Sequence, residues 1–283
     1  MLHSKIKPML SIKTDKPFDS LEYLFEPKYD GIRFILQCCF KKGKIELYTK
    51  PGNRITKQFP EFQDIRLPGV KDIILDGELI ILTGGRPDFA KVMKRFSSGH
   101  EKAKVLVGQL PATMAVFDVL YLNGQSVTEM PLLYRKKLIE DHVPDSELLV
   151  KSMYVENNGV MLFSKIVESS LEGIIAKPKQ SKYYQGQRKL WQKIKNYYYD
   201  EMDVLGYVFG TGRLLVGKNG VPVAQALGLP PADRKALVKL LPEISTKRAG
   251  DTAFVEPGIR CQVKYTVGAT GGMRECVFSG WAV

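Results

Sequence analysis

The sequence predicts an α+β protein made of two units of unequal size. Short apolar strands separated by polar turns run from about residue 23 to about residue 200, and helical stretches interrupt them. After that, glycine-punctuated strands with one short helix follow, which is the pattern of a small β-barrel. We therefore expect a first unit over residues 1–200 and a second over residues 201–283, joined by a short hinge because no Pro- or Ser-rich linker separates them.

Hydrophobic periodicity predicts the individual elements in chain order. In the first unit, runs rich in apolar and β-branched residues predict strands over residues 34–40, 44–49, 73–82, 113–121, 173–177 and 190–195. Apolar residues at helical spacing predict helices over residues 88–96, 132–141 and 161–168. In the second unit, the same reasoning predicts strands over residues 202–209, 225–229 and 260–267 and a helix over residues 232–240.

The composition indicates a polyanionic partner and no zinc site. The 42 Lys and Arg against 30 Asp and Glu give a formal charge of +12, which attracts nucleic acid at long range. The four cysteines form no Cys-x-x-Cys pair and the three histidines lie far apart, so a zinc site is not expected. No apolar run approaches the roughly 20 residues needed to span a bilayer. With so few cysteines, we expect a reduced, cytoplasmic protein without disulfides.

The segment EPKYDGIR at residues 26–33 contains the pattern Lys-x-Asp-Gly-x-Arg. An Asp-Gly pair alone is typical of an exposed turn at the tip of a hairpin. The lysine can also be a nucleophile, but it attacks phosphorus only as the neutral amine, and about 0.1% of unperturbed lysine side chains are neutral at pH 7.5. Because nearby cations raise that fraction, Arg33 and a bound divalent metal ion are candidates for activating Lys28.

Two acidic side chains lie within the apolar segment at residues 73–80. Asp76 and Glu78 are at positions i and i+2, so a strand points both to the same face. Carboxylates in such surroundings need a partner, such as a metal ion or a sugar hydroxyl, unless the face is half exposed.

The segment at residues 190–195 places two lysines on one face of a strand. Lys193 and Lys195 follow Trp191 at alternating positions. Two ammonium groups so placed repel each other unless an anion such as a triphosphate lies between them or the face is solvated. Glu172, at the start of the apolar strand over residues 173–177, is a further isolated acid.

Taken in this order, these segments resemble the nucleotidyl-transferase superfamily of ATP-dependent DNA ligases, RNA ligases and mRNA capping enzymes. The resemblance extends from residue 25 to residue 281. The segments FDVLYLNG at 117–124, EGIIAK at 172–177 and WQKIK at 191–195 are similar to the DNA ligase versions, especially those of short bacterial and end-joining enzymes. The resemblance implies an adenylation domain of antiparallel sheets with flanking helices, followed by an OB-fold β-barrel.

The resemblance also implies roles for individual residues. Lys28 is expected to be the nucleophile that forms a lysyl-AMP phosphoramidate. Glu26 is expected beside the adenine, and Phe117 is expected to stack on it. Arg33 and Glu78 are expected to contact the ribose and the terminal nucleotide.

The same comparison assigns the metal and the phosphates. Glu78 and Glu172 are expected to hold Mg²⁺ or Mn²⁺, and Lys193 and Lys195 are expected to bind the α-phosphate and the pyrophosphate. Lys50 stands where the family usually has the arginine of Ser-Arg-x-Gly. A lysine keeps the charge but lacks the bidentate fork of a guanidinium, which weakens the expected ribose or phosphate contact.

The implied reaction is ATP-dependent sealing of nicks in duplex DNA through lysyl-AMP and AMP-DNA, in DNA repair, replication or recombination. An RNA ligase or a capping-type nucleotidyltransferase is the alternative that shares the lysine chemistry. A catalytically impaired DNA-binding module is a second alternative, because Ala282 stands where the resemblance places the arginine of the family's C-terminal Arg-x-Asp-Lys motif. The expected partners are nicked duplex DNA and a Ku-type end-joining protein, and we expect a nucleoid-associated monomer without a membrane contact.

Overall fold

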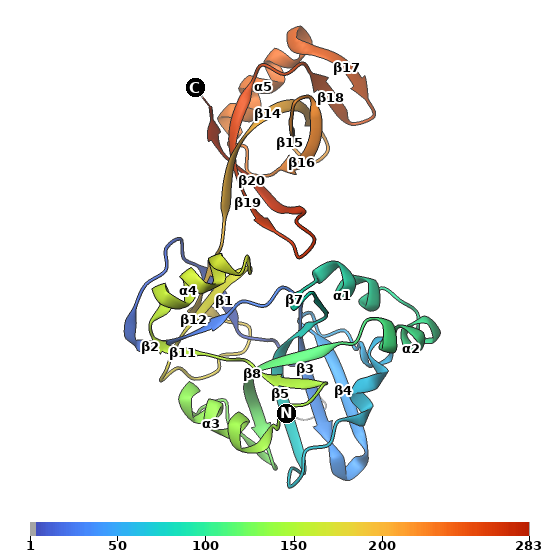
Figure 1. The fold of residues 1–283 in the computed structure, drawn as a ribbon, viewed down its shortest axis with the longest axis vertical. Coiled ribbons are helices and arrows are strands. Elements are labelled where there is room, and N and C mark those ends of the chain that lie inside the picture. Colours follow the sequence, from blue (N-terminus) through green and yellow to red (C-terminus); the bar gives the residue numbers. More distant parts are fainter. Residues whose placement is uncertain (1–3, 283) are drawn as a thin grey trace. The chain divides into compact units, whose positions relative to one another are not determined.

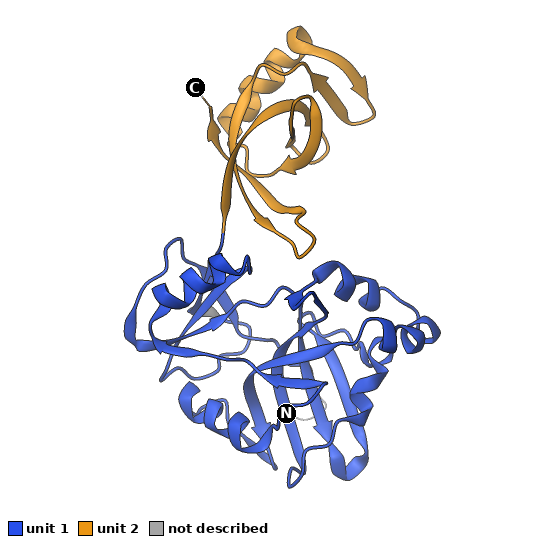
Figure 2. Cartoon of the chain, in the orientation of Figure 1, with its two compact units in different colours: residues 1–196 blue, residues 197–283 orange. Residues whose placement is uncertain are grey.

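The computed structural model describes residues 4–282, and the chain divides into two compact units, residues 1–196 and 197–283 (Figure 2). Position 200, where the sequence placed the boundary, lies inside strand β14 (Tyr198–Val208). Val283 lies outside the described residues. Sheets and helices occur together in the chain, which confirms the predicted α+β class. No helix within the described part of the chain is long and apolar enough to cross a membrane.

The first sheet of the larger unit has the strand order β1-β13-β12-β2-β11. Strand β1 runs parallel to β13, whereas the other neighbours are antiparallel. Helix α4 (Gly159–Glu168) covers one face of this sheet, where Leu162 and Ile166 pack against Phe25 and Ile174 (Figure 1). The strands are β1 (Leu10–Lys13), β2 (Ser20–Pro27), β11 (Val155–Asn157), β12 (Gly173–Pro178) and β13 (Arg188–Lys195).

The second sheet has the order β10-β8-β5-β3-β4, with β9 paired to β8, and it carries the largest core cluster of the unit. Its strands are β3 (Ile32–Cys39), β4 (Lys44–Thr49), β5 (Asp72–Ile80), β8 (Thr113–Leu122), β9 (Gln125–Ser126) and β10 (Leu149–Lys151). The pair β6 (Leu82–Thr83) and β7 (Arg86–Pro87) forms a separate small hairpin. The helices of this half are η1 (Phe40–Lys42), η2 (Thr56–Gln58), η3 (Pro60–Asp64), α1 (Phe89–Phe96), α2 (His100–Gln109) and α3 (Leu132–His142).

A third core cluster lies between the two sheets. It joins Trp191 of β13 to Ile35, Ile74 and Phe117 of the second sheet, with Met9 from the N-terminal segment. Because burial of apolar surface is the main force that holds such layers together, this cluster fixes the two sheets against each other. The side chains of both sheets that border this cluster are therefore held at fixed positions relative to one another.

The segment of residues 28–31 crosses from one sheet to the other. Strand β2 pairs with β12 and β11, while β3 pairs with β4 and β5. The hairpin turn considered for the Asp30-Gly31 pair is therefore wrong, because the flanking strands are not partners. A Cβ on Gly31 would lie 2.1 Å from the carbonyl oxygen of Leu79, so the crossing requires glycine there.

The smaller unit is a strongly curved sheet with the order β16-β15-β14-β18-β17. It is extended by β19, which pairs with β14, and by β20, which pairs with β19. A parallel bridge between Leu227 and Val277 links the end of β16 to β20 and makes the sheet a partial barrel. Helix α5 buries Leu237 and Leu241 against the barrel core. The elements are β14 (Tyr198–Val208), β15 (Arg213–Lys218), β16 (Val221–Ala226), α5 (Pro231–Ile244), β17 (Ser245–Ala249), β18 (Thr252–Val255), β19 (Arg260–Val267) and β20 (Met273–Trp281).

Candidate active site

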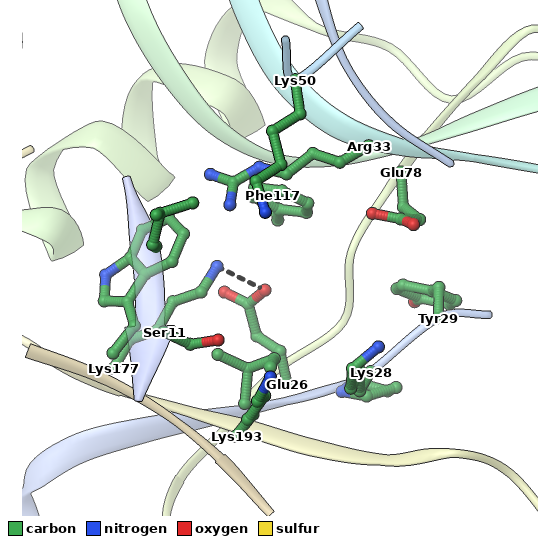
Figure 3. A pocket seen from close by; sticks show the side chains of 14 residues that line it. Ser11, Glu26, Lys28, Tyr29, Arg33, Lys50, Glu78, Phe117, Lys177 and Lys193 are labelled. Atoms are coloured by element: carbon green, nitrogen blue, oxygen red, sulfur yellow. Dashed lines mark hydrogen bonds and ion pairs between the residues drawn. The ribbon is translucent and has the colours of Figure 1, made fainter. Parts of the chain in front are cut away.

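A cavity of about 240 Å³ lies in the larger unit, lined by residues of both sheets. Figure 3 shows Lys28, Tyr29 and Glu78 on one side of it and Lys177 on the other. Among the residues expected from the sequence, those that line the cavity are Glu26, Lys28, Arg33, Lys50, Glu78, Phe117 and Lys193. The motifs are separated by up to about 160 residues in the chain, so the fold brings them together.

Lys28 sits directly after β2, and its amine is held by Glu172. Its Nζ atom is 2.7 Å from both carboxylate oxygens of Glu172. The Lys28 backbone N–H donates to the carbonyl of Gly173, which fixes the segment at the start of β12. Lys195 Nζ is 3.3 Å from Glu172 Oε1. Glu172 and Lys195 do not line the cavity. Glu172 is connected to it through its contact with Lys28, and Lys195 through its contact with Glu172.

The guanidinium of Arg33 is held by Asp76 from the neighbouring strand. Nε and Nη2 donate to the two Asp76 oxygens at 2.9 and 2.6 Å, and Nη1 donates to the Met9 carbonyl. The Tyr183 hydroxyl donates to the same carboxylate at 2.6 Å. The partners of the buried Asp76 are therefore Arg33 and Tyr183. Of Asp76 and Glu78, Glu78 is the one that lines the cavity.

The environment of Glu78 suits a divalent cation. Desolvation raises the pKa of Glu78 to about 8, against the opposing effect of Lys28 and Arg33, and the negative charge of Glu172 raises it further. A cation beside Glu78 and Glu172 would offset both effects. Among the described residues, no group of three or more His, Cys, Asp or Glu side chains could hold a metal ion by itself. Mg²⁺ is commonly held by one or two carboxylates plus substrate phosphates, so the donor set fits it.

The other end of the cavity is aromatic and contains a buried lysine. Lys177 Nζ lies 4.3 and 4.2 Å from the ring centroids of Phe117 and Trp191 and 2.8 Å from Glu26 Oε2. Burial lowers the pKa of Lys177 to about 8, although Glu26 opposes this effect. Ile175, two residues earlier on β12, adds an apolar wall.

Sequence reasoning missed Lys177, Trp191 and the N-terminal strand as parts of this cavity. Lys177 and Ile175 alternate along one strand face, and Trp191 begins the row that contains Lys193, so alternation was a usable signal for both side chains. Ser11 had no comparable signal, because β1 forms only by pairing with β13.

The cavity is strongly cationic. Its lining has five cations (Lys28, Arg33, Lys50, Lys177 and Lys193) against two carboxylates (Glu26 and Glu78). Together with the aromatic end, this charge pattern fits a ligand that has a flat base at one end and several phosphate charges at the other.

Comparisons with known proteins give the following similarities. Residues 6–195 match the family model described as ATP dependent DNA ligase domain. The chain is 31% identical over 281 residues to the SPbeta prophage-derived DNA ligase-like protein LigB of Bacillus subtilis (strain 168), covering 98% of this chain and 99% of that one. It is 27% identical over 289 residues to the DNA ligase of Thermococcus fumicolans, covering 92% of this chain and 51% of that protein, so it spans about half of that relative.

The fold is also similar to a solved structure. It aligns with the mycobacterial DNA ligase D complexed with ATP and MES at a TM-score of 0.59 and 22% identity, covering 98% of this chain and 95% of that one. This likeness supports the predicted combination of a nucleotidyl-transferase domain with an OB-fold barrel.

Proposed function

Because the chain belongs to the family of ATP-dependent DNA ligases, we propose that it seals nicks in duplex DNA through AMP carried on Lys28. Membership confirms the family resemblance seen in the sequence and favours DNA ligase over an RNA ligase or a capping enzyme. The observation that supports the residue assignment is the position of the Lys28 amine, in the cationic cavity and 2.7 Å from Glu172.

In the first step of this proposal, the Lys28 amine attacks the α-phosphorus of ATP. The ammonium must first lose a proton, and Glu172 is the base in contact with Nζ that can accept it. A phosphorus–nitrogen bond then forms and the bond to the β-phosphate oxygen breaks, releasing pyrophosphate. In this proposal, Lys193, which lines the cavity, and Lys195, whose Nζ atom is 3.3 Å from Glu172 Oε1, would bind the phosphates.

The next two steps transfer AMP to DNA and then remove it. The 5′-phosphate of the nick attacks the phosphorus of lysyl-AMP, so the phosphorus–nitrogen bond breaks and AMP-DNA forms. The 3′-hydroxyl then attacks the 5′-phosphorus, forming the phosphodiester and releasing AMP. Both are phosphoryl transfers that depend on positioning and charge stabilisation.

The remaining lining residues orient the nucleotide in this proposal. Glu26 and Phe117 bind the base, while Arg33, fixed by Asp76, and Glu78 contact the sugar. Glu78 and Glu172 would hold Mg²⁺ or Mn²⁺ together with phosphate oxygens. Such an ion neutralises charge on the phosphates when it is bound.

The direct test is incubation with labelled ATP or GTP, followed by addition of nicked DNA or of RNA ends. We expect labelled AMP on the protein and its release on sealing of nicked DNA. Labelling by GTP would indicate a capping-type enzyme, and sealing restricted to RNA would indicate an RNA ligase. Stoichiometric DNA binding without any labelling would indicate the impaired DNA-binding module.

Nick binding is expected to weaken steeply as salt rises, because contacts to phosphates release counterions. If six or more phosphates are neutralised, affinity should fall by about 1,000-fold or more between roughly 50 and 200 mM salt. It should also be nearly independent of base sequence. An equilibrium titration of nicked duplexes of different sequence measures both, and a flat salt response would contradict phosphate-dominated binding.

Lys50→Arg is expected to strengthen ATP binding. The arginine would restore a bidentate donor at a position that lines the cavity, whereas a lysine acts as a point charge. The KM for ATP in lysine adenylation should fall by roughly 3- to 10-fold. Lys41→Arg, an exposed position outside the cavity, is the matched control. A KM that is unchanged in Lys50→Arg would mean that Lys50 does not contact the nucleotide.

Family membership implies a DNA substrate. The protein partner and the location in the cell stay predictions. A Ku-type end-joining protein and association with the nucleoid rest on the sequence resemblance. The monomeric state also stays a prediction.

A further inference from the structure

The carboxylate of Glu26 is held between two lysines. Its Oε1 atom is 2.6 Å from Lys136 Nζ, and its Oε2 atom is 2.8 Å from Lys177 Nζ. All three side chains are almost completely buried, with exposed fractions of 2% for Glu26, 6% for Lys136 and 1% for Lys177. The Ser152 hydroxyl donates to Oε2 at 3.3 Å. Charges taken so far from water need compensation, which the two lysines and the buried carboxylate give each other.

The two lysines approach Glu26 from different sides. Lys177, on β12, lines the cavity, whereas Lys136 comes from α3 and is not among the residues of the lining. Lys136 Nζ lies 5.3 Å from the ring centroid of Tyr154, and Lys177 Nζ faces Phe117 and Trp191. The two ammonium groups are thus stabilised by the Glu26 carboxylate and by the faces of these three aromatic rings. Of these three charged groups, Glu26 and Lys177 line the cavity and Lys136 does not.

We propose that Lys136 is a positioning residue for the base end of the nucleotide site. It holds Glu26 through Oε1, so that Oε2 and the Lys177 ammonium face the cavity as a fixed acceptor and donor for the edge of a nucleobase. This inference rests on the proposed ATP site.

The consequence is discrimination between purines. Adenine carries an amino donor next to a ring-nitrogen acceptor, and guanine carries a carbonyl acceptor next to a ring N–H donor. A fixed carboxylate can accept from the amino group of adenine while a fixed ammonium donates to the neighbouring ring nitrogen. Guanine presents the donor and acceptor in the opposite order, and the buried polar groups left unpaired would be costly. Without Lys136, Oε1 loses its cationic partner, and the Glu26 carboxylate, still paired with Lys177 through Oε2, is free to rotate out of the orientation that the base requires.

The first measurement is the split between KM and kcat in lysine adenylation. Lys136→Met keeps the length of the side chain and removes its charge, and we expect the KM for ATP to rise by about 10-fold with kcat changed by less than about 3-fold. The preference for ATP over GTP should fall by a similar factor. Lys136→Arg should restore most of the affinity. Lys137→Met, at the exposed neighbouring position on α3, is the matched control and should behave as the wild type.

The second measurement is the pH dependence of ATP affinity, which a purely structural role would leave unchanged. Lys177 faces Glu26 on β2, Lys136 on α3 and Asp118 on β8. Burial lowers the pKa of Lys177 to about 8, Glu26 and Asp118 raise it, and Lys136 lowers it. In the wild type, the Lys177 donor is charged below that pH and neutral above it, so affinity should weaken as pH rises through about 8. Removing the Lys136 charge raises the pKa of Lys177, so Lys136→Met should move this limb to higher pH.

The outcomes separate this inference from the proposed function. If the wild type forms no covalent AMP, the proposed function fails. If the wild type is labelled but Lys136→Met, correctly folded by circular dichroism, keeps its KM, its ATP preference and its alkaline limb, the inference about Lys136 is overturned. Should Lys136→Met not fold, Lys136→Gln is measured in the same way, with the same results expected.

Discussion

Replacing Lys28 by alanine is expected to abolish both the covalent attachment of AMP and the sealing of nicks with ATP. The substitution removes the amine that the proposal uses as nucleophile. The rate of labelling should fall by at least about 1,000-fold. The measurement is a denaturing gel of protein incubated with labelled ATP.

A pre-adenylated nick separates the role of Lys28 from general damage to the site. In this substrate AMP is already on the 5′-phosphate, so the lysine nucleophile is not needed and some sealing by Lys28→Ala should survive. Lys41→Ala, at an exposed position on η1, is the control for handling and folding. Labelled AMP persisting on Lys28→Ala would show that another lysine is the nucleophile.

The residues that the proposal uses as reacting groups could be singled out from the sequence because they lie in short local patterns. Lys28 and Arg33 occur within one segment, and Lys193 and Lys195 alternate on one strand. The strands over residues 44–49 and 260–267 agree with the sequence-predicted bounds because their apolar alternation is strong.

The groups that support the reacting residues could not be predicted, because their partners are distant in the chain. Asp76 meets Arg33 and Tyr183 only when strands from separate segments pair. Strand β1 is four residues long and pairs with β13, so its own sequence carries little signal. Helix α2 was missed because Ala103 and Leu106 are its only buried residues, which leaves a weak apolar stripe.

The ion pair between Arg135 and Asp118 belongs to the same unpredicted class and is expected to have the largest effect on stability. Both side chains are completely buried. Arg135 Nε and Nη2 donate to the two Asp118 oxygens at 2.7 and 2.9 Å, while Nη1 donates to the carbonyls of Met130 and Ser181. The guanidinium therefore ties α3 to β8 and to the segment that leads to Tyr183.

Arg135→Met is expected to lower the free energy of unfolding of the larger unit by about 3–5 kcal/mol, because it leaves a buried carboxylate without its guanidinium partner. Asp118→Leu should lower the free energy of unfolding by a similar amount, because it leaves the buried guanidinium without its carboxylate partner. The double variant Asp118→Leu/Arg135→Met removes both charges and should be less destabilised than the sum of the single variants by at least about 2 kcal/mol.

Urea unfolding followed by Trp191 fluorescence in a Trp281→Phe background measures this coupling, because Trp191 is buried in the larger unit and the sequence has two tryptophans. Lys137→Met on the same helix should change the free energy of unfolding by less than about 0.5 kcal/mol, since its ion pair with Asp141 is exposed. Additive single effects would mean that the two charges do not depend on each other.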